Sequence, residues 1–175
     1  MLGNDATIKS FSTGQEPYSI LMTLLESVPK LDISQVKILA TDIDVAVLDR
    51  AASGIYHLRD IEKIPPIYRQ KYFERIASTA GDESVRFKGS YGRAITFAPF
   101  NLITPSYGFA HKFDFVFCRN VLIYFDHDMV LQILENLRKS TSIGGYLFLG
   151  HSEAGSMRSP HVDNVATAVY RNKVG

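Results

Sequence analysis

Hydrophobic positions in the first third of the chain alternate between two patterns. The segment at residues 8–11, with apolar Ile8 and Phe11 at its ends, and the mostly apolar run at 36–41 predict two short strands. Each predicted strand is followed by apolar residues at helical spacing, which are Ile20, Leu21, Leu24, Leu25 and Val28 after the first and the segment VAVLDRAA after the second. The order strand, helix, strand, helix is typical of a parallel sheet covered by helices.

The residues that flank these two helices support the assignment. Glu16 and Pro17 favour a helix start, because a carboxylate suits the positive end of the helix dipole and proline fits the first turn. Pro29 follows the end of the first helix. Asp44 is a good N-cap for the second helix, and Gly54 is a natural residue just past its end.

The middle of the chain, at about residues 55–93, departs from this alternation. It predicts a helix at 67–78, from the segment IYRQKYFERIAS, and short strands at 85–88 and 94–98 on either side of GSYGR. We interpret this region as a small inserted β-subdomain that leads into an antiparallel hairpin. The chain is then expected to return to the main sheet at 95–97.

The strand and helix alternation resumes in the last third of the chain. The pattern predicts a strand at 113–118, an amphipathic helix at 128–140, a strand at 146–152 and a last strand-like segment at 165–170. We therefore expect one α/β domain over residues 1–175, with the inserted subdomain inside it.

Composition limits the classes of function. Of the 175 residues, 46% are hydrophobic and 21% are charged, as in ordinary globular domains. Nineteen basic and 18 acidic residues give a formal net charge of +1, so nothing favours a nucleic-acid partner. No run of 18 apolar residues predicts insertion into a membrane, and the N-terminus lacks the apolar core of a signal peptide. The single cysteine, Cys118, fits a reducing cytoplasm.

Polar residues follow the predicted strands at the point where each strand ends. In an open parallel sheet these carboxyl ends meet at one edge, and ligands bind there, near the point where strand order reverses. The residues are Ser12 to Glu16 after the first strand, Asp42 after the second, Asn101 after the third, Arg119 and Asn120 after the fourth, and His151, Ser152 and Glu153 after the fifth. We expect them to line one crevice.

This set of residues suits a nucleoside that carries positive charge. An acid can hold ribose hydroxyls, an amide can contact a base edge, and backbone amides can hold a carboxylate or a phosphate. The chain contains neither GxxxxGK(S/T) nor GxGxxG, and Glu16 at the mouth of the first helix would repel a pyrophosphate. S-adenosylmethionine fits better, because it carries an ammonium and a sulfonium and no phosphate.

Six short motifs, in chain order, resemble those of the CheR-type chemotaxis receptor methyltransferases: FSTGQEPYS, ATDID, SGIY, FNL, FCRNVLIYFD and GHSE. The resemblance extends from about residue 8 to about residue 171. Members of this family transfer a methyl group from S-adenosylmethionine to glutamate side chains of bacterial chemoreceptors and release S-adenosylhomocysteine. The resemblance therefore implies a Rossmann-like methyltransferase sandwich with a small antiparallel β insertion, a cytoplasmic location and a methyl-accepting chemoreceptor domain as the partner.

The same resemblance implies a role for each matching residue. The cofactor-binding residues would be Gly14, Glu16, Asp42, Asn101, Leu102, Arg119 and Asn120. Glu16 would face the methionine amino group, and Asp42 would hold the ribose hydroxyls. Asn101 and Leu102 would meet the adenine region. Arg119 and Tyr124 are the catalytic candidates, with Tyr124 near the transferred methyl. The acceptor carboxylate is already ionised at neutral pH, so the reaction depends on alignment and a dry pocket rather than on a strong base.

Each of these residues also has a purely structural interpretation. Asp42 could be a turn residue, Glu16 could only complement the helix dipole, and Arg119 could pair with a structural acid. Tyr124 could pack in the core with its hydroxyl satisfied elsewhere. No metal is expected, because the five histidines lack metal-ligand spacing. Cys118 is not expected to be a nucleophile, because no paired histidine is identifiable.

Three classes of function are open at this point. The first is a protein-glutamate O-methyltransferase of chemosensory type. The second is a non-catalytic module that holds S-adenosylmethionine or S-adenosylhomocysteine, or docks on receptors. The family carries a helical segment before the first strand, whereas seven residues precede that strand in this sequence, which is then either a piece of a longer protein or a reduced relative. The third is a methyltransferase of the same fold with another acceptor. The sequence does not identify the receptor, its glutamates or the oligomeric state.

Overall fold

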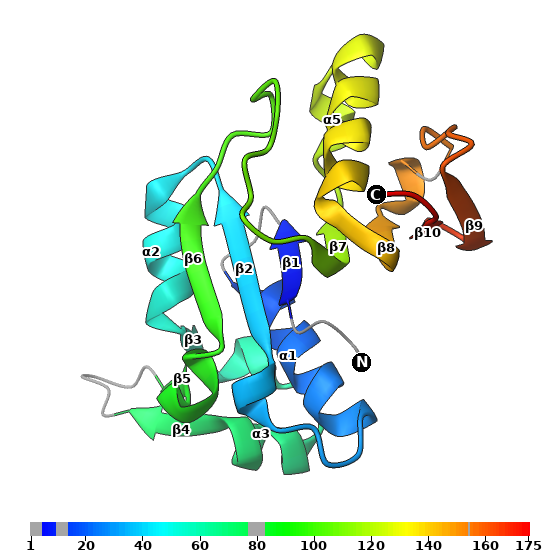
Figure 1. Ribbon diagram of the computed structural model, residues 1–175. Helices are drawn as coiled ribbons and strands as arrows, with labels where there is room; N and C mark the ends of the chain where they lie inside the picture. Colours follow the sequence, from blue (N-terminus) through cyan, green and yellow to red (C-terminus); the bar gives the residue numbers. More distant parts are fainter. Residues whose placement is uncertain (1–4, 10–13, 77–82, 154) are drawn as a thin grey trace.

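The computed structural model describes residues 5–9, 14–76, 83–153 and 155–175. Its largest element is a seven-stranded sheet in the order β6-β2-β1-β7-β8-β10-β9 (Figure 1). The strands are β1 (Asp5–Lys9), β2 (Lys37–Asp42), β6 (Ile95–Pro99), β7 (Phe113–Cys118), β8 (Thr141–Leu149), β9 (Val162–Ala166) and β10 (Val169–Asn172). The first five strands in this order pair in parallel, and β10 and β9 pair antiparallel at the edge. The predicted parallel α/β sheet is confirmed.

The order of strands reverses at the centre of the sheet. The chain builds outward from β1 through β2 to β6, and then returns to the other side of β1 with β7 and β8. The register brings the carboxyl ends level, since Lys9 lies opposite both Thr41 and Cys118, and Cys118 lies opposite Leu149. The β1–β7 boundary is therefore the switch point at which a sheet of this kind binds ligands. Residues 10–13, which include Ser12 and Thr13 and the predicted end of the first strand, lie outside the described residues.

Helices cover both faces of the main sheet. They are α1 (Gln15–Ser27), α2 (Val45–Ser53) and α5 (His127–Ser140), whereas α3 (Pro66–Tyr72) and α4 (Gly89–Gly92) belong to the inserted region. On one face, Leu21 of α1 shares a hydrophobic core with Ile38 of β2. On the other face, Ile133 of α5 packs with Val116 and Leu147 of the central strands. Figure 1 shows α2 beside β2 and β6, and α5 beside β7 and β8. The predicted ends of α2 are confirmed by the Asp44 cap and by Gly54 in the left-handed conformation.

A second, three-stranded antiparallel sheet lies between α2 and β6 along the chain, in the order β3-β5-β4. Its strands are β3 (Ile55–His57), β4 (Phe73–Ile76) and β5 (Ser84–Phe87). The helix predicted at 67–78 is wrong at residues 73–76, because α3 ends at Tyr72 and Phe73 begins β4, and residues 77–78 lie outside the described part of the chain. Pairing with β5 satisfies the backbone of 73–76 and sets the Phe73 ring 5.3 Å from that of Phe87. This tertiary pairing outweighs the helical spacing of the aromatic residues.

Three other predictions about strands need correction. No hairpin joins 85–88 to 94–98, because β5 pairs with β3 and β4 while β6 pairs in parallel with β2. The return to the main sheet at 95–97 is confirmed. The segment 165–170 is not one strand, since it contains the turn between β9 and β10, where Ala168 has φ 59°. The strand predicted at 146–152 begins earlier, at Thr141, and ends at Leu149.

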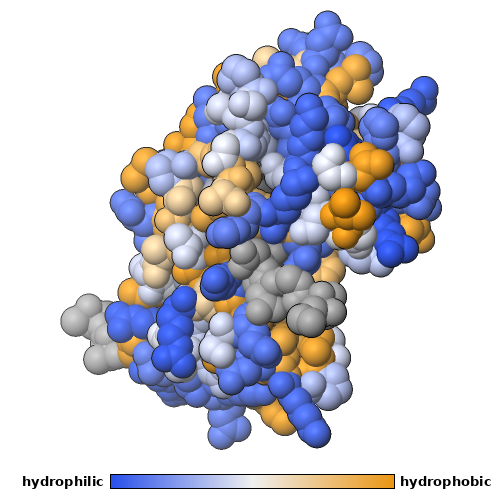
Figure 2. Space-filling view, in the orientation of Figure 1, coloured by the Kyte–Doolittle hydropathy of each residue, from blue (hydrophilic) through white to orange (hydrophobic). Residues whose placement is uncertain are grey.

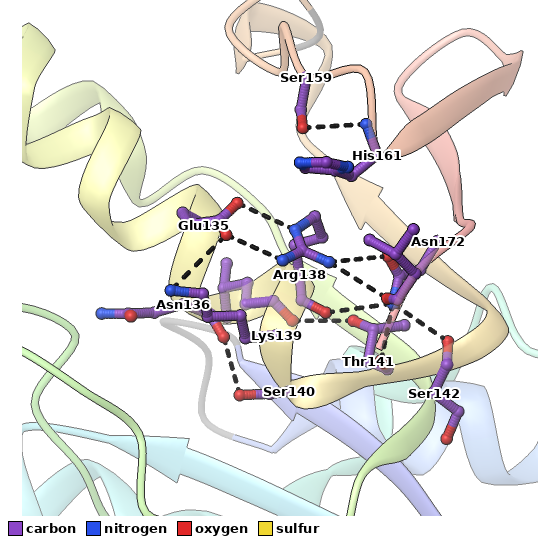
Figure 3. Close-up of polar contacts among 12 residues, drawn as sticks. Glu135, Asn136, Arg138, Lys139, Ser140, Thr141, Ser142, Ser159, His161 and Asn172 are labelled. Atoms are coloured by element: carbon purple, nitrogen blue, oxygen red, sulfur yellow. Dashed lines mark hydrogen bonds and ion pairs between the residues drawn. The ribbon is translucent and has the colours of Figure 1, made fainter.

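A buried arginine anchors the end of the chain (Figure 3). Arg138 of α5 donates from Nη1 to Oδ1 of Asn172 at 3.3 Å and to the carbonyl oxygen of Val174 at 3.2 Å. Its Nε and Nη2 donate to both carboxylate oxygens of Glu135, which lowers the pKa of Glu135. Asn172 in turn donates to the carbonyl oxygen of Thr141 at 2.8 Å. The network therefore holds β10 to the junction between α5 and β8.

The surface seen in Figure 2 carries hydrophobic residues in small groups among hydrophilic ones. Among the side chains that the structure describes, the three most exposed large hydrophobic ones are Tyr124, Ile67 and Ile143, which come from three different parts of the chain. Within the residues that the structure describes, no helix combines the length and the apolar character needed to cross a membrane.

An ion pair joins α1 to α3. Nζ of Lys71 lies 2.6 Å from Oε1 of Glu26, and the hydroxyl of Tyr72 donates to the same carboxylate oxygen. The bond from Lys71, followed by that from Tyr72, lowers the pKa of Glu26 below its ordinary value of 4.5. The pair therefore links the inserted region to the first helix. Because its pKa is lowered, the Glu26 carboxylate stays ionised at a lower pH than a free glutamate does.

We expect Glu26→Gln to lower the urea midpoint at neutral pH and to lower it by less at about pH 3, below the ordinary pKa of glutamate. Because the folded-state pKa is lowered, the stabilisation is present above the ordinary pKa of glutamate and is lost as the pH falls through the lowered value. Urea unfolding at both pH values measures this, with the exposed Glu62→Gln as the control. An equal shift at the two pH values would contradict the assignment.

Candidate functional site

The turn before α1 depends on a glycine. Gly14 has φ 89°, and a Cβ atom placed there would lie 2.8 Å from the hydroxyl oxygen of Tyr56 and 3.0 Å from Cβ of Ala51. The hydroxyl of Tyr18 donates to the carbonyl oxygen of Ala51 at 2.9 Å, and burial raises the pKa of Tyr18 to about 12. The turn thus packs directly on the end of α2, and both its backbone conformation and its lack of space require glycine.

Asp42 ends β2 and is only 5% exposed. Its Oδ1 accepts a hydrogen bond from the N–H of Asp44 at 2.9 Å. Its carbonyl oxygen accepts one from the N–H of Phe100 at 2.9 Å, which ties the end of β2 to the end of β6. The interpretation of Asp42 as a turn residue is therefore correct for Oδ1, and a ligand role for the second carboxylate oxygen stays a prediction.

Asn101 and Leu102 follow β6 but differ in environment. Asn101 is exposed, and its Oδ1 accepts from the N–H of Ile103 at 3.2 Å. Leu102 is 5% exposed and belongs to the core beneath α5. Its carbonyl oxygen accepts from the hydroxyl of Tyr107 at 2.7 Å. The Leu102 side chain is thus part of the core, and Asn101 is the polar side chain that β6 delivers to the edge.

An ion pair spans the switch point of the sheet. Nη1 of Arg119, just past β7, lies 3.2 Å from Oε1 of Glu16 in the first turn of α1. The side chains are 45% and 18% exposed, respectively. Arg119 therefore does have an acidic partner, as its structural interpretation required. A half-exposed pair of this kind contributes little to stability, so a ligand can separate it at low cost.

Tyr124 lies in the short 3-10 helix η3 (Leu122–Tyr124) and is 74% exposed. The core-packing interpretation of Tyr124 is therefore wrong. Leu122, two residues earlier, is 3% exposed and supplies the core contact of this segment. The same short helix thus buries its first residue and presents Tyr124 to solvent beyond the end of β7.

Sequence reasoning missed the role of Glu153. It was expected to line the crevice, but it is 2% exposed and lies in the 3-10 helix η4 (His151–Glu153). Its carboxylate accepts four backbone hydrogen bonds, from the N–H groups of Asn120, Val121, Leu122 and Gly150. The signal in the sequence is a glycine at the end of a strand, Gly150, followed three residues later by an acid, Glu153. This spacing lets the chain turn back so that the carboxylate reaches the end of the strand.

A cavity of about 530 Å³ lies on the α1 side of the sheet. Its charged or titratable lining residues are Glu16, Arg119 and His151. Most of the other lining residues are apolar, and they include Phe117 and Phe148, whose rings stack at 4.4 Å. The strand-end residues of β2 and β6 do not line this cavity. The ion pair therefore stands between an apolar groove on one side and the polar ends of β2 and β6 on the other.

The structure thus brings most predicted site residues to the carboxyl edge of the sheet, and it excludes the Leu102 and Glu153 side chains from the surface of that edge. Among the described residues, no three His, Cys, Asp or Glu side chains lie together as metal ligands do. Cys118 is buried. The edge presents an acid beside a base at its centre and a second acid with an amide on neighbouring strands, which suits a polar ligand with both charges and hydroxyl groups.

Comparison with known proteins connects this edge to a family. Residues 9–170 match the model of the family described as CheR methyltransferase, SAM binding domain. Chemotaxis protein methyltransferase 1 of Vibrio cholerae is 41% identical over 161 residues, which are 88% of this chain and 57% of that protein. The chemotaxis protein methyltransferase of Escherichia coli is 41% identical over 143 residues, 81% of this chain and 49% of that protein. The chain spans about half the length of these curated relatives.

Solved structures agree on the fold. The glycopeptide N-methyltransferase MtfA aligns with a TM-score of 0.51 at 10% identity, over 85% of this chain and 47% of that one. PKMT2 from Rickettsia typhi, in complex with AdoHcy, aligns with a TM-score of 0.51 at 12% identity, over 84% of this chain and 20% of that one. At these identities the likeness establishes the fold alone, and it confirms the predicted methyltransferase-type sandwich.

Proposed function

Because the chain belongs to the CheR methyltransferase family, as its SAM-binding domain, we propose that it binds S-adenosylmethionine and methylates glutamate side chains of bacterial chemoreceptors. The products are glutamyl methyl esters and S-adenosylhomocysteine. The family resemblance seen in the sequence motifs is confirmed by the match over residues 9–170 and by relatives at about 40% identity. Those relatives are named chemotaxis protein methyltransferases, and receptor glutamates as the acceptors are what the resemblance of the sequence motifs implies.

The observation that carries this proposal is the ion pair between Glu16 and Arg119. The methionine end of the cofactor carries an ammonium and a carboxylate, which match an acid beside a base. Binding then exchanges one half-exposed ion pair for two charge-assisted contacts, with Glu16 on the ammonium and Arg119 on the carboxylate. A nucleotide phosphate has no equivalent of the ammonium and would meet Glu16 with like charge.

The neighbouring strands supply partners for the adenosine part. Asp42, at the end of β2, would accept from the ribose hydroxyls with the oxygen that does not bond Asp44. Asn101, at the end of β6, would contact the adenine edge. Because the end of β2 is hydrogen-bonded to the end of β6 through Asp42 and Phe100, these two side chains are held on adjacent strand ends.

S-adenosylmethionine supplies an electrophilic methyl group, which the acceptor carboxylate takes by in-line displacement. The protein does not need to remove a proton, because a glutamate carboxylate is ionised at neutral pH. Its residues must align the carboxylate and limit water around it. Tyr124 is exposed beyond the end of β7, and this exposure supports a role in which its hydroxyl would donate a hydrogen bond that orients the acceptor.

Tyr124→Phe is expected to lower kcat by about tenfold and to leave the affinity for S-adenosylhomocysteine unchanged, because it removes one hydrogen bond to a charged group. Single-turnover methylation and titration calorimetry measure the two quantities. The control is Tyr68→Phe, on α3 in the inserted region, which is expected to change neither. Unchanged turnover in Tyr124→Phe would remove this residue from the reaction.

Transfer of a radiolabelled methyl group from S-adenosylmethionine to chemoreceptor-containing membranes tests the proposed activity. Label that is released as methanol by mild base identifies glutamyl methyl esters and supports the proposal. Base-stable label, or label on another acceptor, would show that the protein methylates a group other than receptor glutamates. Cofactor binding without methyl transfer to any acceptor would identify a binding module.

A further inference from the structure

Glu153 is enclosed at the edge of the sheet between the ends of β7 and β8. Its Oε1 accepts from the N–H groups of Val121 at 2.9 Å and Leu122 at 2.8 Å. Its Oε2 accepts from the N–H groups of Gly150 at 2.7 Å and Asn120 at 3.3 Å. With 2% of its surface exposed, the carboxylate has exchanged its water shell for these four backbone donors.

Three of the donors are consecutive, and they belong to the segment that carries the central site residues. Asn120 has φ 56°, a left-handed conformation that turns the chain sharply after β7. Consecutive backbone N–H groups around such a turn form a concavity that binds anions. Here the anion is the protein's own carboxylate, so this concavity is already filled and does not serve a ligand phosphate or carboxylate. The charge of the cofactor carboxylate therefore has to be met elsewhere, at Arg119.

Gly150 makes room for this arrangement. A Cβ atom at position 150 would lie 2.5 Å from Oε2 of Glu153 and 3.1 Å from the backbone nitrogen of Asn120. Any larger residue would therefore push the carboxylate away from its donors or displace the segment after β7. The end of β8 thus leaves room for the Glu153 carboxylate beside its backbone donors. If Glu153 only filled space, this close fit to its carboxylate would not be needed.

We infer that Glu153 is a positioning residue for the cofactor site, which fixes residues 119–124 so that Arg119 meets Glu16 and Tyr124 faces outward. This inference rests on the proposed function for the identity of the ligand. Glu153 touches no reacting atom, since its carboxylate is buried beneath the segment. It acts through the backbone of 120–122, which connects Arg119 on one side to Tyr124 on the other.

Glu153→Gln is the first test. The amide has nearly the same size but only one acceptor oxygen, so its NH₂ group must face two of the four backbone donors. We expect the Kd for S-adenosylhomocysteine to rise about tenfold or more, the scale of losing hydrogen bonds to a charged group. Hydrogen exchange of the amides of residues 120–122 should accelerate, whereas that of Leu137 in α5 should not. The control is Asp32→Asn, an acid-to-amide change at a carboxylate that also accepts a backbone N–H, at the opposite edge of the sheet.

Glu153→Ala in the presence of formate is the second test. The truncation leaves a space lined by four N–H groups, and formate supplies a carboxylate of the right size to enter it. Formate is expected to restore most of the lost cofactor affinity, and chloride at the same ionic strength is not. A residue that only filled space would show no such selective rescue.

The outcomes separate the two proposals. The positioning role is overturned if a folded Glu153→Gln variant binds S-adenosylhomocysteine as tightly as the wild type. It is also overturned if Asp32→Asn loses as much affinity for this ligand as Glu153→Gln does. If the wild-type chain binds no S-adenosylhomocysteine, the proposed function fails, and the exchange rates of 120–122 in Glu153→Gln and wild type still decide whether Glu153 holds this segment.

Discussion

Replacing Asp42 by asparagine is expected to weaken binding of S-adenosylhomocysteine by about 1–3 kcal/mol, or roughly 5- to 150-fold in Kd. Asparagine keeps a side-chain oxygen that can accept from the N–H of Asp44, as Oδ1 of Asp42 does at 2.9 Å. It replaces the second oxygen with an NH₂ group, which cannot accept from a ribose hydroxyl. The substitution therefore preserves the turn and removes only the proposed ligand contact.

Titration calorimetry with S-adenosylhomocysteine measures this effect, and urea unfolding shows whether stability is preserved. The matched control is Asp44→Asn, two residues away, where asparagine is as good an N-cap as aspartate. The control is expected to change neither quantity. Wild-type affinity in Asp42→Asn would return Asp42 to its turn role alone.

Arg138→Met is expected to reduce the free energy of unfolding by roughly 2–4 kcal/mol, the largest stability effect that we predict for a single polar side chain. Methionine has a similar length but no donor, so the buried Oδ1 of Asn172 and the carbonyl oxygen of Val174 lose their partner. Glu135 is 40% exposed, so water can solvate its carboxylate once Arg138 is replaced. The loss of this ion pair therefore adds little to the destabilisation.

The control for this substitution is the next residue along α5. Lys139 is 62% exposed and lies 3.7 Å from the same carboxylate of Glu135, so Lys139→Met should change stability by no more than about 0.5 kcal/mol. Urea unfolding of the two variants under identical conditions makes the comparison. Equal stabilities would show that the network in Figure 3 contributes nothing beyond a surface ion pair.

The parts of the fold that could be predicted from the sequence are those with local signals. The strand at 113–118 has the predicted boundaries, because its apolar run is bounded by polar residues on both sides. The α2 helix begins and ends as predicted, because Asp44 and Gly54 act on the backbone within two or three residues of themselves. Strand ends and helix caps place Asp42, Asn101 and Arg119 at one edge without knowledge of the tertiary structure.

Features that depend on distant partners could not be predicted in this way. Phe73 leaves the helical pattern because β4 pairs with β5, which lies more than ten residues further along the chain. The turn between β9 and β10 has Thr167 and Ala168 where glycine or asparagine is usual, so the hairpin is not visible in the sequence. Glu153 is buried because two strand ends together provide four donors, and no periodicity reveals such a partnership.

Titration calorimetry of the wild-type chain with S-adenosylhomocysteine, beside ATP as a matched adenosine ligand, shows which kind of ligand the edge of the sheet binds. We expect one site of roughly micromolar affinity for S-adenosylhomocysteine, and no binding of ATP, whose phosphates would face Glu16. Failure of a folded chain to bind S-adenosylhomocysteine, or equal binding of both ligands, would contradict the assignment of the Glu16–Arg119 pair to the amino-acid end of the cofactor.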